Sequence, residues 1–119
     1  MQEFRFLDWQ VYKDARQLIR DIYVTTGKFT QNFRYELGSQ INRSVISIAL
    51  NIAEGSGKGS DKDLNRFFNI AIGSSNETLA GLDIARDNGL ITQAQFDDFK
   101  IKITDISRQI GGFQKRLKN

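Results

Sequence analysis

The chain has 119 residues, of which 39% are hydrophobic and 26% are charged, and its net charge is +3. This length and composition are those of one globular domain with a single core. It contains no cysteine and no histidine, which excludes disulfides, thiolate zinc sites and every mechanism that uses histidine as base or metal ligand. The sequence therefore predicts a protein that is not an enzyme, with no catalytic residue, no metal site and no cofactor.

The first predicted helix carries one apolar stripe at helical spacing, which consists of Leu7, Val11, Ala15, Leu18 and Ile22. The helix ends at the segment Thr25 to Gly27. The following residues, 28–38, form an aromatic-rich connection that contains Phe29, Phe33 and Tyr35. We expect these three rings to cap one end of the core.

The second predicted helix runs from Ser39, a suitable N-cap, to Glu54. Its seam consists of Ile41, Val45, Ile48 and Ile52, and four more apolar residues, Ile46, Ala49, Leu50 and Ala53, widen the apolar sector to about half of the circumference. One core does not need so wide a sector. We therefore expect this helix to be central in the fold or to contact another copy of the chain.

Capping signals delimit the last two predicted helices. Ser60 and Asp63 open a helix over residues 61–88, which the pair Asn88-Gly89 ends. Thr92 and Gln95 form a second capping box, which opens a helix with the most regular apolar seam of the chain: Phe96, Phe99, Ile103, Ile106, Ile110, Phe113 and Leu117. Short connections then predict an all-α fold, an antiparallel up-down-up-down four-helix bundle, as one domain over residues 1–119.

Two polar stripes accompany the second and third predicted helices. The first consists of Gln40, Arg43, Ser47, Asn51 and Glu54, and the second contains Arg66, Asn69, Gly73 and Glu77. Antiparallel neighbours whose numbers add to a constant would pair Arg43 with Glu77 and Glu54 with Arg66. One interpretation is a solvated outer face, where such pairs contribute about 0 to 1 kcal/mol. The other is a polar seam that fixes helix register or lies at a subunit contact.

Basic residues gather near the C-terminus, where Arg108, Lys115, Arg116 and Lys118 occur without an acidic residue after position 106. Cations suit the C-terminal end of a helix, so this pattern has an ordinary structural explanation. The alternative is contact with phosphate, to which Lys58 and Lys62 beside the third predicted helix would add. These six residues are the candidate nucleic-acid contacts.

The chain shows no signal for secretion or membrane insertion. No apolar run approaches the roughly 20 residues of a membrane helix. The first ten residues carry Glu3 and Asp8 and lack the apolar region of a signal peptide. We expect a cytoplasmic protein without membrane contact.

The segment QINRSVISIALNIAEG at residues 40–55, followed by RFFNIAIGSSNE at residues 66–77, resembles the bacterial four-helix-bundle family of intervening-sequence proteins of 23S ribosomal RNA genes. The accessory protein of diversity-generating retroelements is similar in fold. An opening of the form Leu-x-Trp at Leu7 and Trp9 also matches. The sequence departs from the family at Thr30 and Ala49, where proline is frequent, and Ala49 puts a mid-helix kink in doubt.

The resemblance implies a ring-like homopentamer that works beside nucleic acid or a reverse transcriptase. Together with the basic residues and the wide apolar sector, it leads to one main functional hypothesis, a non-enzymatic oligomeric accessory protein that contacts RNA or DNA. The alternative hypothesis is a scaffold that binds a polypeptide partner such as a reverse transcriptase.

Overall fold

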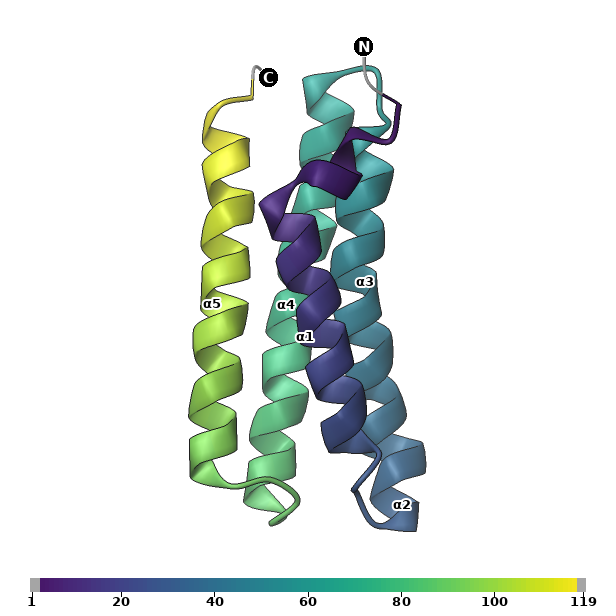
Figure 1. The fold of residues 1–119 in the computed structure, drawn as a ribbon, viewed down its shortest axis with the longest axis vertical. Coiled ribbons are helices and arrows are strands. Elements are labelled where there is room, and N and C mark those ends of the chain that lie inside the picture. The colour runs from purple at the N-terminus through teal and green to yellow at the C-terminus, as the bar shows by residue number, and fades with distance from the viewer. Residues whose placement is uncertain (1–2, 118–119) are drawn as a thin grey trace.

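The computed structural model describes residues 3–117, and within this range every element is helical. The four long helices are α1 (Gln10–Thr26), α3 (Ser39–Ser56), α4 (Asp61–Asp87) and α5 (Gln93–Lys115). Three shorter elements are η1 (Arg5–Asp8), α2 (Gln31–Phe33) and η2 (Arg34–Gly38). Consecutive long helices run in opposite directions, and the α3–α4 turn and the end of α5 lie at the same end of the bundle (Figure 1). The predicted all-α bundle is confirmed.

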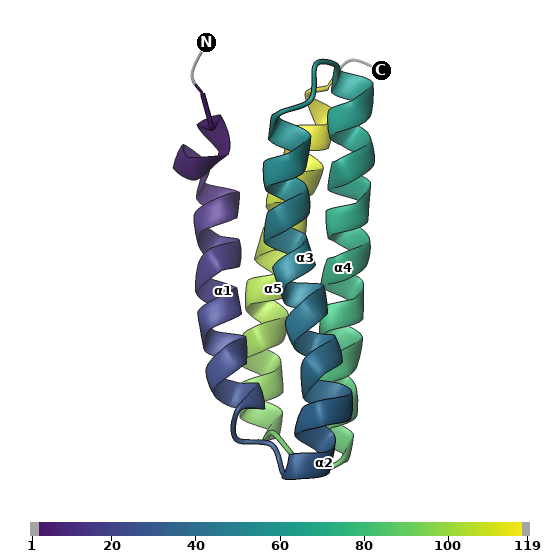
Figure 2. The ribbon, with the colours of Figure 1, turned by 90° about the vertical axis from the view of Figure 1, so that its right-hand side faces the viewer.

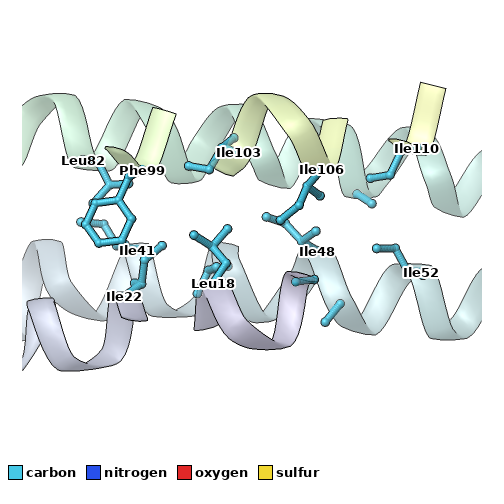
Figure 3. Close-up of a cluster of buried hydrophobic side chains, with 14 of the residues drawn as sticks. Leu18, Ile22, Ile41, Ile48, Ile52, Leu82, Phe99, Ile103, Ile106 and Ile110 are labelled. Carbon is cyan, nitrogen blue, oxygen red and sulfur yellow. The ribbon is translucent and has the colours of Figure 1, made fainter. Parts of the chain in front are cut away.

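The core runs along the axis of the bundle, and isoleucine is its most frequent residue. Ile22 of α1 lies at the level of Ile41 of α3, and Ile106 of α5 lies at the level of Ile48 of α3, with Leu18 of α1 between these two levels (Figure 3). Aromatic rings close one end, where Trp9 packs on Phe113 with ring centres 4.7 Å apart. The apolar seams predicted for the second and fourth helices both face the interior of the bundle, as burial of apolar surface requires.

The caps predicted from the sequence are present. The Ser60 hydroxyl accepts a hydrogen bond from the Asp63 amide at 3.2 Å, and Thr92 and Gln95 make both bonds of a capping box. Gly89 ends the α4 region with a φ of 71°, a left-handed conformation that glycine adopts without strain. These local signals placed α4 and the start of α5 correctly.

The second helix begins earlier than predicted. Ser39 has helical backbone angles, so it is not an N-cap; the helical backbone starts after Thr30 and continues through a π turn, η2, into α3. Of the three rings expected to cap the core, Phe29 is buried, whereas Phe33 is partly exposed and Tyr35 is 69% exposed. The rings point outward because the segment is helical and only one of its faces meets the core.

The start of the first helix also differs from the prediction. Leu7 lies in the short helix η1 and is 48% exposed, so the apolar stripe of α1 begins at Val11. Within residues 3–117, no helix is long and apolar enough to cross a bilayer.

Candidate functional site

A seam of hydroxyl groups joins α3 to α4. Ser44 and Thr78, both buried, contact each other at 2.8 Å, and one turn further along Ser47 contacts Ser74 at 2.7 Å. The Asn51 amide extends the seam by donating to the carbonyl and hydroxyl oxygens of Ser47. Ser47 and Asn51 of the polar stripe therefore make their hydrogen bonds along the contact between α3 and α4.

Small residues let α3 and α4 approach closely along this seam. A Cβ atom on Gly81 would lie 2.6 Å from Cγ1 of Ile41, and one on Gly55 would lie 3.0 Å from Cδ1 of Leu64. Both distances are shorter than ordinary carbon contacts. The two helices thus form a tightly packed pair, which is seen side by side in Figure 2.

The two ion pairs predicted between the stripes are not formed. Glu54 instead pairs with Lys58, at 3.0 Å, and the Arg66 guanidinium lies over the ring of Phe67. Within residues 3–117, neither Arg43 nor Glu77 takes part in a salt bridge. The hydroxyl contacts between α3 and α4 give a register one or two residues away from the predicted one. Because these hydroxyl groups occupy the seam, the longer charged side chains lie beside the seam in solvent.

Exposed apolar side chains flank the hydroxyl seam on its outer side. Leu50 of α3 is 61% exposed and Ile70 of α4 is 45% exposed. The contact between Ser47 and Ser74 brings the turns that carry Leu50 and Ile70 to the same level. This confirms the excess apolar surface predicted for the second helix, although Ala49 is buried. We call this surface the α3–α4 face; it consists of Arg43, Ile46, Leu50, Ala53, Glu54, Arg66, Phe67, Ile70 and Glu77.

An open hollow of about 1070 Å³ lies at one end of the α3–α4 face. The N-terminal segment forms one wall with Phe4 and Phe6, while Leu50 and Leu64 line the other side. Arg5 holds the segment in place, since its Nε donates to the carbonyl oxygen of Ser56 at 3.1 Å. The hollow offers apolar walls with charged groups at its rim.

The candidate nucleic-acid contacts lie in separate parts of the chain: Lys58 is in the turn between α3 and α4, Lys62 is in the first turn of α4, and Arg108 and Lys115 are in α5. Lys58 is engaged with Glu54 and lies over the Phe67 ring, and Arg116 lies over the Phe113 ring at 5.0 Å. Lys62, Arg108 and Lys115 are exposed, Lys118 lies outside the described residues, and Gln40 of the polar stripe is exposed on α3.

Sequence reasoning missed two groups of residues. The first is the buried hydroxyl set Ser44, Ser74 and Thr78, which could have been found from small polar residues at positions that share a helix face with the apolar seam. The second is a row of cations on α1, which consists of Lys13, Arg16 and Arg20, all exposed. Their spacing of three and four was visible in the sequence.

These features define a class of protein: a four-helix bundle with one closely packed helix pair and an exposed apolar face. Residues 7–112 match the family model described as 23S rRNA-intervening sequence protein, and the chain belongs to this family. It is also similar in structure to a protein of unknown function from the S23 ribosomal protein family of Bacteroides thetaiotaomicron. That likeness has 25% sequence identity and a TM-score of 0.79, and it covers 88% of this chain and 98% of the other. A comparison with curated proteins found no match.

Proposed function

We propose that this chain is a non-enzymatic accessory protein whose copies assemble through the α3–α4 face and contact nucleic acid through basic surface. The observation that carries the assembly is the exposure of Leu50 and Ile70 at one level of a closely packed helix pair. Since Leu50 is 61% and Ile70 is 45% exposed, their burial in a contact contributes about half of the roughly 1.5 to 3 kcal/mol that a fully exposed side chain of this size would give. The close packing of α3 against α4 adds to this, because groups that are already held in place lose little conformational freedom on binding.

The charged residues around the apolar centre suit a contact between copies. Arg43 and Glu77 have no salt bridge within residues 3–117, so each is free to pair with an opposite charge of a neighbouring copy. If they pair with each other across the contact, reversing either one should weaken assembly and reversing both should restore it. Purely additive effects would show that they meet other partners.

Contact with nucleic acid is supported by exposed cations of α4 and α5, among them Lys62, Arg108 and Lys115. The net charge of +3 per chain is mild. Assembly repeats it, up to fivefold in the homopentamer implied by the resemblance, and a repeated charge strengthens attraction to phosphate.

The assembly is tested by light scattering on the wild-type protein, on Leu50→Arg/Ile70→Arg and on the control Ile101→Arg. Ile101 is an exposed apolar residue of α5 and lies outside the α3–α4 face. We expect wild type and control to be oligomers and the double variant to be a monomer with unchanged helix content. A monomeric wild type in dilute solution would refute the proposal.

Nucleic-acid contact is tested by fluorescence anisotropy with labelled RNA and DNA at increasing salt. We expect binding at low salt that weakens steeply as salt rises, because phosphate contacts release counterions. Absence of binding to either polymer at low salt would leave the alternative, a scaffold for a polypeptide such as a reverse transcriptase. The hollow with its Phe4, Phe6 and Leu64 walls favours that alternative, and recovery of a protein partner after nuclease treatment would support it.

A further inference from the structure

The acidic and basic residues of helix α1 lie on different sides of the helix. Its two acids point toward α5, where Asp14 accepts a hydrogen bond from Gln109 at 2.8 Å and Asp21 pairs with Lys102 at 3.3 Å. Its three cations, Lys13, Arg16 and Arg20, are exposed on another side of the helix. The helix therefore presents an outer surface of one sign.

The cations of α1 are positioned by neutral groups. The Arg16 guanidinium lies over the Tyr12 ring, 5.9 Å from its centre, and the Arg20 guanidinium donates to the Gln17 amide oxygen at 2.5 Å. Within residues 3–117, none of Lys13, Arg16 and Arg20 takes part in a salt bridge. Two of the three side chains are thus oriented while their charges stay uncompensated, which suits an anionic ligand.

An exposed aromatic ring continues this surface. Tyr23, 45% exposed, follows Arg20 by three residues. At about 100° per residue, Lys13, Arg16, Arg20 and Tyr23 fall within about 80° of the helix circumference, and the cations span about 10 Å of the axis. We call these four residues the α1 face.

The surroundings of the α1 face indicate where a ligand would run. Asp14 and Asp21 lie on the α5 side of the helix, and Asp105 of α5 accepts from Gln109 on that same side. Thr26 marks the α3 side of the helix, since its hydroxyl donates to Oδ1 of Asn42 at 2.9 Å, and at about 100° per residue Arg16 and Tyr23 fall within about 80° of it on the helix circumference. A polyanion therefore avoids the carboxylates if it follows the α3 side of the helix.

We propose that the α1 face binds single-stranded nucleic acid, with phosphates on Lys13, Arg16 and Arg20 and an unpaired base stacked on Tyr23. A single strand fits because its bases are free to stack on an exposed ring, whereas those of a duplex are not. This inference rests on the proposed nucleic-acid function and names a site for it that is separate from the C-terminal cations.

The test compares two matched triple variants, Lys13→Gln/Arg16→Gln/Arg20→Gln and Arg108→Gln/Lys115→Gln/Arg116→Gln, each of which removes three cations. The probe is a fluorescein-labelled mixed-sequence RNA of about 20 nucleotides, longer than one binding site of this kind. Anisotropy is measured at several salt concentrations. We expect the α1 variant to reduce the slope of log K against log salt by about 2, the value for three lost contacts to a single strand, and the C-terminal variant to reduce it by less than 1.

The base contact is tested with Tyr23→Ala, for which we expect about tenfold weaker binding of the single strand and little change for the same strand annealed to its complement. Circular dichroism and light scattering on every variant separate loss of binding from loss of fold or assembly.

The outcomes distinguish the two proposals. Vesicles that contain phosphatidylserine serve as a second anionic probe. If the wild-type protein does not bind the RNA, or binds only these vesicles, both the nucleic-acid function and the α1 site are refuted. If the wild type binds and only the C-terminal variant loses the salt dependence, the function stands and the α1 site is wrong. Equal binding of single strand and duplex, unaffected by Tyr23→Ala, would also overturn the site as proposed.

Discussion

Replacement of Gly81 by alanine tests the close approach of α3 and α4. The new Cβ atom would lie 2.6 Å from Cγ1 of Ile41, so the helices must separate or the Ile41 side chain must leave its position. Separation is resisted by the contact between Ser44 and Thr78, one turn away. Overpacking of this kind costs about 1 to 3 kcal/mol.

The matched control is Gly73→Ala in the same helix, where the added Cβ meets no atom within 4 Å. Alanine is a better helix former than glycine by about 1 kcal/mol, and this gain applies to both variants. The difference between them therefore isolates the packing cost. We expect Gly81→Ala to be less stable than Gly73→Ala by about 1 to 3 kcal/mol.

The measurement is urea-induced unfolding followed by circular dichroism at one fixed protein concentration, because assembly makes stability depend on concentration. Adding Ile41→Ala to Gly81→Ala should cost less than the sum of the two single effects, since the alanine removes the atom that clashes. Equal stability of Gly81→Ala and Gly73→Ala would show that the helices are not held at this distance.

Three further predictions concern single contacts. Ser44→Ala and Thr78→Val should each cost about 1 kcal/mol, and the double variant should cost less than their sum in a double-mutant cycle, because both single variants lose the same contact between the two hydroxyl groups. Thr92→Ala should lower the free energy of unfolding by about 1 kcal/mol through loss of the capping box, and Thr92→Ser should retain most of it. The pKa of Lys102 is raised above its ordinary value of 10.5 by its hydrogen bond to Asp98 and, less strongly, by Asp21, against an opposing effect of burial. Its stabilising contribution is therefore complete below about pH 10.5 and is lost as pH rises through the raised pKa, so the stability difference between wild type and Lys102→Met should shrink in that range and with added salt.

Local signals in the sequence were sufficient for much of the fold. Ser60, Thr92 and Gly89 act within one helix turn, so their effect on helix ends can be read without knowledge of the neighbours. The wide apolar sector of the second helix was also visible, and Leu50 is exposed as a surplus apolar residue should be. The sequence predicts well those features that depend on one segment only, namely where a helix begins and ends and which of its faces is apolar.

The contacts between helices were predicted less well. A constant-sum pairing of the polar stripes gave the correct pair of helices and a register wrong by one or two residues, because charge was used as the criterion. The register is set instead by steric fit at Gly81 and by short hydroxyl contacts at Ser44 and Ser47, whose geometry depends on both partners at once. That the acids of α1 point toward α5 was missed for the same reason, since this depends on Lys102 and Gln109 of α5.

The π turn at Arg34–Gly38 shifts the phase of the long helix that runs from α2 into α3. A wide turn accommodates one residue more than an ordinary turn, so it rotates the preceding segment by about 100° about the axis without interrupting the helix. Deletion of one residue here would rotate the start of this helix about its axis. A different set of side chains would then face the end of α1, while the bundle beyond the turn keeps its alignment.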